Sequence, residues 1–348
     1  MAGAMSSDAA RILDALPQPA VLVGPDDRIE AASPGAAQLF GHDGRGRHYV
    51  TVLRQPAALD AIEATRRDGA PREAVWLGRE GARDTTWRLT VRALRQDPGR
   101  RVLATFEDVT ALEEAGQIRR DFVANVSHEL RTPLTSLLGF VETLRGPARG
   151  DPAAQDRFLL VIEREARRMA RLVDDLLSLS RVEAEERRRP TDPVDLGEVA
   201  RAVAAALEPV AARADARIEC LVPERGPVVP GDRGQLGQVL TNLLENALKY
   251  GSSGGVRVRV SGPAPEPALQ AQGVRIEVED EGPGIAPHHL PRLTERFYRV
   301  DDHRSREVGG TGLGLAIVKH VVGRHRGRLR IESERGRGSR FTVILPLG

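Results

Sequence analysis

The sequence of 348 residues contains one cysteine, Cys220, which excludes both a disulfide within the chain and a metal cluster built from cysteines. No apolar run approaches the ~18 to 20 residues that a membrane helix needs, and the N-terminus lacks the apolar core of a signal peptide. A chain of this kind fits a reducing compartment. We therefore expect a cytoplasmic protein without a transmembrane segment, or the soluble portion of a membrane-associated sensor.

Aromatic residues are scarce, at 3% of the chain, and the net charge is only +2 although 51 side chains are basic. All but two of those are arginines, which indicates a bias of composition rather than a basic function. Arginines crowd the stretch 324–340, but acidic residues lie between them, and aromatic side chains that could stack on bases are nearly absent. We expect a solvated surface there and no nucleic-acid partner.

The changes of pattern along the chain predict a multidomain α+β protein with three modules. Residues 9–110 mix strands and helices, whereas 111–188 are helical throughout. A charged stretch at 185–193, broken by prolines, indicates a linker. Helices and strands then alternate through 193–348, with a loop expected at 262–273.

The first module has the pattern of a small sensor domain. It ends in the segment Phe106-Glu107-Asp108-Val109-Thr110, and it resembles a PAS domain with an α/β fold. With no cysteine in the module, a flavin adduct on a cysteine is excluded, and we expect His42 and His48 on surface loops rather than on a haem. The predicted elements are a hairpin of 20–23 and 28–31, a helix at 59–67, and strands at 74–77, 86–94 and 101–106, the last two joined by a turn at 97–100.

The helical module carries a histidine with unusual neighbours. Apolar residues recur at alternating steps of three and four around it, and on that register His128 falls on the face away from the apolar seam. Glu129 is adjacent, and Thr132 lies one turn on, on the same side. An exposed helical histidine is usually just solvated, but one beside a carboxylate is suited to act as a nucleophile near neutral pH.

A second helix follows in the same module. Asp151 can cap it, and Pro152 can occupy its first position. Its apolar residues again step by three and four, so the two helices form an antiparallel hairpin with more apolar surface than one hairpin can cover. We expect two copies to pair as a homodimer with a four-helix bundle.

Asparagine and lysine are also rare, which makes their positions informative. The chain has three asparagines and two lysines, and Asn242, Asn246 and Lys249 fall within eight residues of each other. On a helix they form one stripe. A solvated face would explain such a stripe, yet this chain covers its solvated faces with arginine and glutamate, and asparagine is a poor helix former. Amide oxygens suit Mg²⁺ and a lysine suits phosphate, so we predict a ligand-binding stripe.

Two glycine-rich segments follow. Asp280 continues the inward-facing row of a strand at 274–280, and a carboxylate on a buried face needs a partner. Gly282 and Gly284 come next and let the backbone pass close to a ligand, although a tight turn explains them equally well. The segment 309–315 opens a helix and offers free amide donors to phosphate, with neither Rossmann nor Walker spacing.

Together these segments resemble the histidine-kinase family of two-component signalling over roughly residues 115–347. The local sequence around His128 is most similar to that of PhoR-type phosphate-regulon sensors. Those sensors usually carry membrane helices, which this sequence lacks. The family motifs, in order, are a phospho-acceptor box at 122–134, an N box at 238–250, a first glycine box at 280–285, an F box at 293–300 and a second glycine box at 309–315.

The resemblance implies an α/β-sandwich ATP-binding domain of the Bergerat type. Asp280 would bind the adenine amino group, and Asn246, with Asn242 nearby, would hold Mg²⁺. Further contacts to nucleotide or phosphates are implied for Lys249, Tyr250, Arg299, Gly282, Gly284, Gly310, Thr311, Gly312, Leu313 and Gly314.

The same resemblance implies a phosphotransfer reaction. His128 would attack the γ-phosphorus of ATP through one ring nitrogen, while Glu129 orients or deprotonates the other. The phosphoryl group would then pass to an aspartate on the receiver domain of a separate response regulator. Thr132 would position water for dephosphorylation of that regulator.

Two other classes share part of this pattern. A chaperone-like or topoisomerase-like ATPase would hydrolyse ATP without a phosphohistidine and would have no use for the His128 segment. A pseudokinase scaffold would normally have lost Asn246, Asp280 or the glycines of 309–315, and this chain retains them.

Overall fold

The computed structural model describes residues 10–94, 101–185, 188–251, 255–300 and 310–347. The chain divides into two compact units, Met1–Ala124 and Asn125–Gly348. No helix in the described ranges combines the length and the apolar character needed to cross a bilayer.

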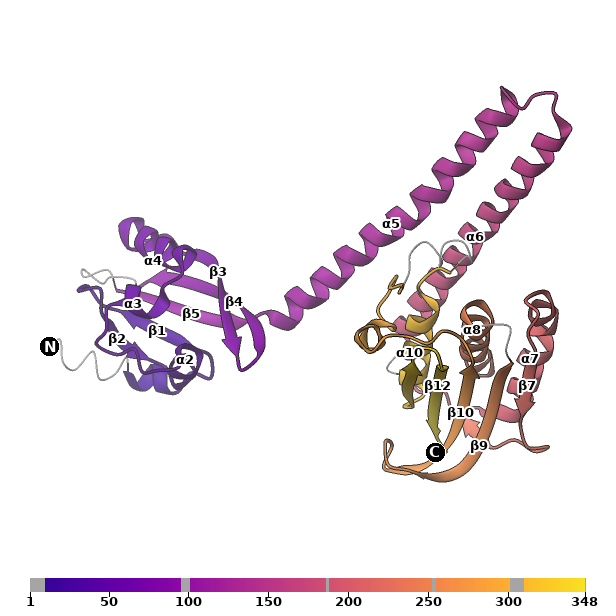
Figure 1. The fold of residues 1–348 in the computed structure, drawn as a ribbon. Coiled ribbons are helices and arrows are strands. Elements are labelled where there is room, and N and C mark those ends of the chain that lie inside the picture. The colour runs from indigo at the N-terminus through magenta and orange to yellow at the C-terminus, as the bar shows by residue number, and fades with distance from the viewer. Residues whose placement is uncertain (1–9, 95–100, 186–187, 252–254, 301–309, 348) are drawn as a thin grey trace. The chain divides into compact units, whose positions relative to one another are not determined.

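The first unit contains a five-stranded antiparallel sheet with helices α2 (Pro34–Phe40), α3 (Tyr49–Leu53) and α4 (Pro56–Asp68) (Figure 1). The predicted strands and the predicted helix within α4 are confirmed, whereas α2 and α3 were not foreseen because so few turns give no clear period. The predicted turn at 97–100 lies outside the described residues. In sheet order the strands are β2 (Ile29–Ala32), β1 (Ala20–Val23), β5 (Val102–Asp108), β4 (Arg83–Ala93) and β3 (Arg72–Glu80).

An aromatic cluster fills the core of this unit. Phe40, Trp76 and Phe106 meet edge to face, with ring centroids 5.4 to 5.8 Å apart. Such T-shaped contacts suit the quadrupoles of the rings and add to the area that they bury. The few aromatics of the module are therefore used mainly for packing.

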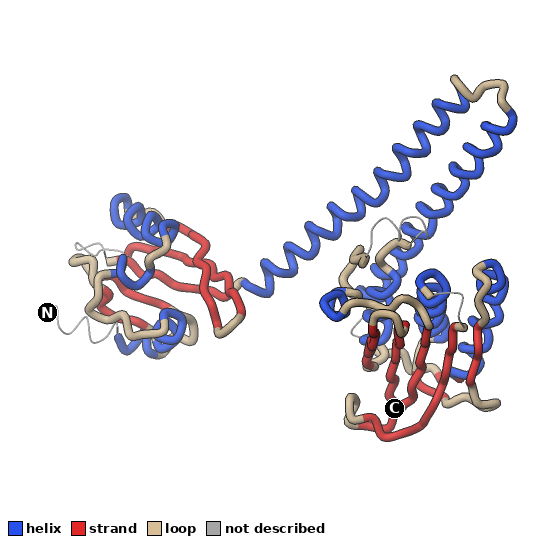
Figure 2. Tube along the Cα trace, in the orientation of Figure 1, coloured by secondary structure: helices blue, strands red, loops and turns tan. Residues whose placement is uncertain are grey.

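The second unit holds the helical hairpin of α5 (Thr110–Arg145) and α6 (Pro152–Ala184), although α5 begins in the first unit. The predicted start of α6 is confirmed, since the Asp151 carboxylate accepts a hydrogen bond from the Ala154 amide at 3.0 Å. Figure 2 shows both long helices and the short turn between them. Apolar residues remain exposed on the hairpin, as the homodimer prediction requires: Leu134, Leu138, Val141, Leu159, Leu160, Val173 and Leu177.

The rest of the second unit is an α/β sandwich, as predicted. Helices α7 (Leu196–Arg213), α8 (Arg233–Tyr250) and α10 (Gly314–Arg324) pack on a five-stranded sheet, in which only the pairing of β7 with β9 is parallel. In order the strands are β11 (Arg328–Glu334), β12 (Gly338–Pro346), β10 (Ala271–Asp280), β9 (Val256–Glu266) and β7 (Ile218–Leu221). Smaller elements are the 3-10 helix η1 (Pro287–Arg292) and the paired strands β6 (Pro193–Asp195) and β8 (Val228–Pro230).

Two sequence predictions fail in this domain. The loop expected at 262–273 is a β-hairpin, with β9 paired to β10 as far as Glu266 and Ala271. Its prolines fit because β7 pairs only with the start of β9, which leaves the far end of that strand an open edge. Within the arginine stretch, Arg324 is not solvated but buried, where it pairs with Glu185 at 2.6 Å.

Candidate active site

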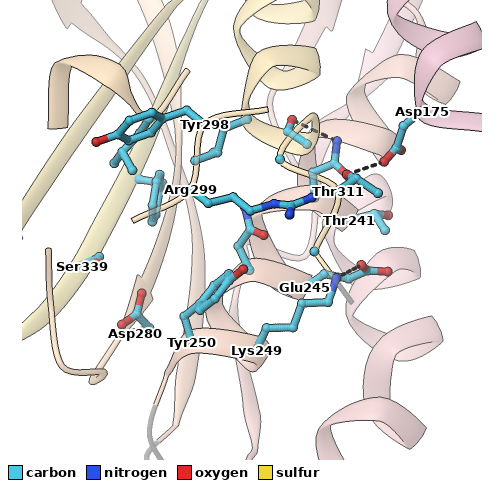
Figure 3. Close-up of a pocket in the computed structure, with 18 of the residues that line it drawn as sticks. Asp175, Thr241, Glu245, Lys249, Tyr250, Asp280, Tyr298, Arg299, Thr311 and Ser339 are labelled. Atoms are coloured by element: carbon cyan, nitrogen blue, oxygen red, sulfur yellow. Dashed lines mark hydrogen bonds and ion pairs between the residues drawn. The ribbon is translucent and has the colours of Figure 1, made fainter. Parts of the chain in front are cut away.

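A cavity of about 850 Å³ lies between α6 and the helices and loops of the α/β sandwich. Figure 3 shows its labelled residues converging from α6, α8, β10 and β12 and from the segments before α10. Gly282 and Leu313 of the predicted set do not line it. The predicted residues that do are Asn242, Asn246, Lys249, Tyr250, Asp280, Gly284, Arg299, Gly310, Thr311, Gly312 and Gly314.

Helix α8 supplies one wall of the cavity. Its apolar face is buried in the sandwich core, which turns the opposite face, with Asn242, Asn246 and Lys249, toward the cavity. The Asn242 amide donates to the carbonyl of Gly314 at 3.3 Å, and the Lys249 ammonium donates to Glu245 at 2.7 Å. Asn242 therefore joins α8 to the second glycine box, which assembles two of the predicted motifs.

Asp280 lies at the end of β10, and its carboxylate accepts a hydrogen bond from the Gly282 amide at 2.9 Å. Burial raises the pKa of the Asp280 carboxyl, while the hydrogen bond from Gly282 opposes that shift. A Cβ atom on Gly282 would lie 2.8 Å from both that carboxylate and the carbonyl of Tyr250. Gly282 therefore packs directly against Asp280 and helps to hold its carboxylate in place.

The second glycine box is shaped by close backbone packing. Gly312 has φ +74°, and a Cβ there would lie 2.9 Å from the backbone of Phe297. The Phe297 amide donates to the Gly312 carbonyl at 2.9 Å, which joins this box to the F box. The Leu313 amide donates to the Thr311 hydroxyl at 3.3 Å. Leu313 is buried and helps to hold the segment rather than line the cavity.

The donor set fits a nucleotide with its metal. Arg299 is almost fully buried, and within the described chain its Nε atom has no hydrogen-bond partner although it belongs to the cavity wall. The described residues contain no group of three or more His, Cys, Asp or Glu side chains that could hold a metal ion by themselves. The amide oxygen of Asn246, which lines the cavity, would suit Mg²⁺ together with the phosphates of a nucleotide.

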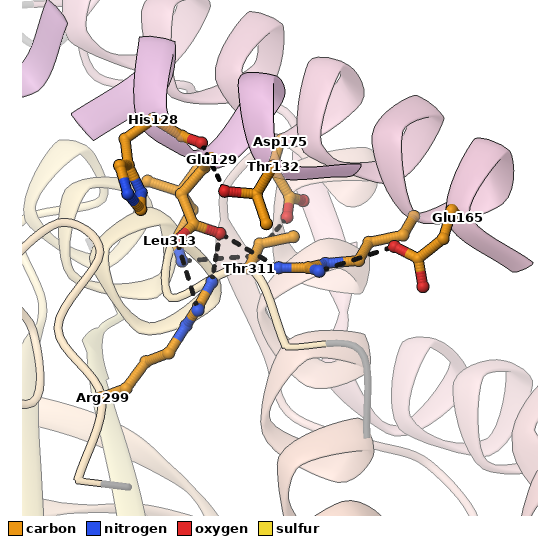
Figure 4. Close-up of polar contacts among 9 residues, drawn as sticks. His128, Glu129, Thr132, Glu165, Asp175, Arg299, Thr311 and Leu313 are labelled. Carbon is orange, nitrogen blue, oxygen red and sulfur yellow. Dashed lines mark hydrogen bonds and ion pairs between the residues drawn. The ribbon is translucent and has the colours of Figure 1, made fainter. Parts of the chain in front are cut away.

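Figure 4 shows the acceptor region on α5. His128 is exposed, as predicted, and the Thr132 hydroxyl donates to its backbone carbonyl at 3.2 Å. In the described structure, the Glu129 carboxylate contacts two guanidinium groups instead of the imidazole. Its Oε2 atom accepts from Arg168 at 3.1 Å and from Arg299 at 2.9 Å.

Sequence reasoning missed the contribution of α6. The Thr311 hydroxyl donates to the Asp175 carboxylate at 2.7 Å, and burial raises the pKa of that carboxyl. Arg168 and Asp175 both lie on α6 and reach residues that had been predicted from other motifs. Charged residues on a long helix are common, so the sequence carried no signal that would have distinguished these two.

Two family models match most of the helical hairpin and of the α/β sandwich. A family model described as "His Kinase A (phospho-acceptor) domain" matches residues 118–185. Another, described as "Histidine kinase-, DNA gyrase B-, and HSP90-like ATPase", matches residues 231–348. Both of the motif groups that were found in the sequence therefore lie inside a matched domain.

The phosphate regulon sensor protein PhoR of Pseudomonas aeruginosa is 42% identical over 242 residues, which are 69% of this chain and 53% of that protein. The sensor-like histidine kinase SenX3 of Mycolicibacterium smegmatis is 38% identical over 256 residues, 74% of this chain and 65% of that protein. This chain thus spans less than two thirds of either relative.

A crystal structure of the histidine kinase ThkA in complex with response regulator protein TrrA has the same fold. The TM-score is 0.53 at 23% identity, with 97% of this chain and 98% of that chain covered. Matched acceptor and ATPase domains, together with these relatives, show that the chain belongs to the family of sensor histidine kinases.

Proposed function

We propose that this chain transfers the γ-phosphoryl group of Mg·ATP to His128 and then to an aspartate on the receiver domain of a response regulator. The observation that supports this most directly is the contact between Arg299, which lines the cavity, and Glu129, the neighbour of His128. Through that contact the cavity and the acceptor helix meet. An ATPase that only hydrolyses its nucleotide would not need such a contact.

The proposed chemistry has two steps. One ring nitrogen of His128 attacks the γ-phosphorus; the N–P bond forms as the bond to the bridging oxygen breaks, and the electron pair leaves with ADP. The proton on the other ring nitrogen passes to the Glu129 carboxylate, so the imidazole stays neutral. In the second step the N–P bond breaks as an aspartate oxygen of the regulator takes the phosphoryl group.

Different residues of the cavity bind different parts of the nucleotide. Asp280 accepts a hydrogen bond from the adenine amino group, while Lys249, Tyr250 and Arg299 contact the nucleotide or its phosphates. Asn246, together with the nucleotide, would hold Mg²⁺, which would supply positive charge to the phosphate oxygens. Thr311 and the glycines of the second box, Gly310, Gly312 and Gly314, line the part that closes over the phosphates.

Each of the three modules has its own role and partners in this reaction. The N-terminal module, 9–110, acts as a PAS-like sensor, 111–188 form the dimeric phosphotransfer hairpin, and 193–348 bind ATP. A second copy of the chain covers the exposed apolar face of the hairpin. The regulator docks on the bundle near His128; the similar kinase ThkA is described in complex with response regulator protein TrrA.

Incubation of the purified protein with γ-labelled ATP and Mg²⁺ tests the proposal. We expect a label on the protein that is labile in acid and stable in alkali, because a phosphoramidate has that behaviour and a phosphate ester does not. Release of labelled phosphate without any labelled protein would instead identify an ATPase. Nucleotide binding with neither product would identify a scaffold, and both of these outcomes contradict the proposal.

Thr132→Ala is expected to slow dephosphorylation of the phosphorylated regulator about tenfold or more, because its hydroxyl would no longer position water. Autophosphorylation should stay within about twofold of wild type, since Thr132 contacts only the His128 carbonyl in the described structure. The measurement is the loss of label from purified phosphorylated regulator.

Thr143→Ala is the matched control for that substitution. Thr143 lies on the same helix, and its hydroxyl makes the same kind of bond, to the Gly139 carbonyl at 2.8 Å. An equal loss of phosphatase activity in Thr132→Ala and Thr143→Ala would mean that the loss comes from a disturbed helix backbone and not from the missing Thr132 hydroxyl. An unchanged rate of regulator dephosphorylation in Thr132→Ala would contradict the role proposed for Thr132 in that reaction.

A further inference from the structure

Glu129 pairs with two charged side chains that come from two other segments of the chain. Its own side chain is 14% exposed, that of Arg168 on α6 is 12% exposed, and that of Arg299 beyond η1 is 4% exposed. A carboxylate so far removed from water needs cations and hydrogen bonds around it to replace the water contacts that it has lost. The two guanidinium groups provide both.

These two arginines differ in what else they contact. Arg299 lines the nucleotide cavity with Asn246, Lys249 and Asp280. Arg168 does not line it, and among the described residues its other ion pair is with Glu165 on its own helix at 3.7 Å. Negative phosphates in the cavity therefore compete with Glu129 for Arg299 but leave Arg168 in place.

The origin of each arginine leads to the same distinction. Arg168 and Glu129 both belong to the α5–α6 hairpin, so their contact is internal to that element. Arg299 belongs to the α/β sandwich, and its contact with Glu129 depends on how that domain lies against the hairpin. When Arg299 binds phosphate, Arg168 is the cation that still holds the Glu129 side chain in place next to His128.

We propose that Arg168 is a positioning residue for phosphoryl transfer, which keeps the Glu129 carboxylate aligned beside His128 while Arg299 turns to the phosphates. This inference rests on the proposed autokinase function. In the part of the chain that the structure describes, Arg168 neither lines the cavity nor contacts the imidazole, so we expect it to act through Glu129. It should affect the rate of the transfer step and not the binding of ATP.

The test compares Arg168→Gln, Arg168→Lys and Arg167→Gln in the full chain. Initial rates of labelling of His128 over a range of ATP concentrations give kcat and KM for each. Arg168→Gln is expected to lower kcat about tenfold or more with KM within about twofold, because only the transfer step uses Glu129. Arg168→Lys keeps the positive charge and should recover a large part of kcat.

Arg167→Gln is the matched control. Arg167 is the neighbouring residue on α6, but its side chain is 75% exposed and it pairs with Glu163 on the same helix. Such a surface pair contributes little, so kcat and KM should both match wild type. Thermal unfolding of every variant establishes whether a loss of rate comes from loss of the fold.

A double-mutant cycle with Glu129→Gln separates positioning from a general structural effect. If Arg168 acts only through Glu129, then Arg168→Gln should lower kcat no further in the Glu129→Gln background. Wild-type kcat in Arg168→Gln, a lysine variant no better than glutamine, or additive losses in the cycle would each overturn the inference. Absence of phosphohistidine in the wild-type protein would instead overturn the proposed function itself.

Discussion

His128→Gln should reduce the amount of acid-labile label on the protein about a thousandfold or more, because glutamine has no nitrogen lone pair that can attack the γ-phosphorus. ATP affinity should remain within about twofold of wild type, since His128 is exposed on α5 and does not line the cavity. The two quantities are measured separately, by labelling with γ-labelled ATP and by calorimetric titration with a non-hydrolysable analogue.

His288→Gln serves as the control for loss of a histidine. His288 is likewise exposed and lies outside the cavity lining, so its substitution should leave both labelling and affinity unchanged. Persistence of the label in His128→Gln would place the phosphoryl group on another residue. A parallel loss of ATP affinity would mean that the variant had disturbed the nucleotide site.

Asp280→Asn should weaken ATP binding about 10- to 100-fold, because it exchanges the charged acceptor proposed for the adenine amino group for an amide. The same substitution is expected to stabilise the protein without nucleotide near pH 7. Burial raises the pKa of the Asp280 carboxyl, so its ionised form destabilises the fold, and asparagine carries no charge. Calorimetric titration measures the first effect, and thermal unfolding without nucleotide measures the second.

The sign of the pH dependence follows from the raised pKa. A carboxyl whose pKa is higher in the folded state stabilises the fold fully below its unfolded value of about 3.9, and this contribution is lost as pH rises through the folded value. The advantage of Asp280→Asn in unfolding temperature should therefore be largest near pH 7 and shrink toward pH 4.

Asp192→Asn is the control for this pair of effects. Asp192 is exposed just before the same module, so neither stability nor affinity should change. Unchanged ATP affinity in Asp280→Asn would remove its role in adenine recognition. A lower unfolding temperature at pH 7 would mean that the hydrogen bonds to the carboxylate outweigh the cost of burying its charge.

Most of the nucleotide site could be predicted from local patterns. The period of α8 placed Asn242, Asn246 and Lys249 on one face, and the alternation along β10 turned Asp280 inward. All four residues line the cavity. These predictions succeed because a helix or a strand has a fixed period, so burial of one face determines the direction of the other. The hairpin at 262–273 was missed because prolines normally argue against a strand, and only the sheet topology provides the open edge that accepts them.

The sequence by itself determined which residues could do the chemistry and on which face of each element they lie, because periodicity and composition are local properties. Only the tertiary structure decided what Glu129 contacts. Its partners lie 39 and 170 residues away in the chain, at Arg168 and Arg299. A buried carboxylate pairs with whichever cations the fold brings within a few ångströms, and no spacing in the sequence encodes that meeting.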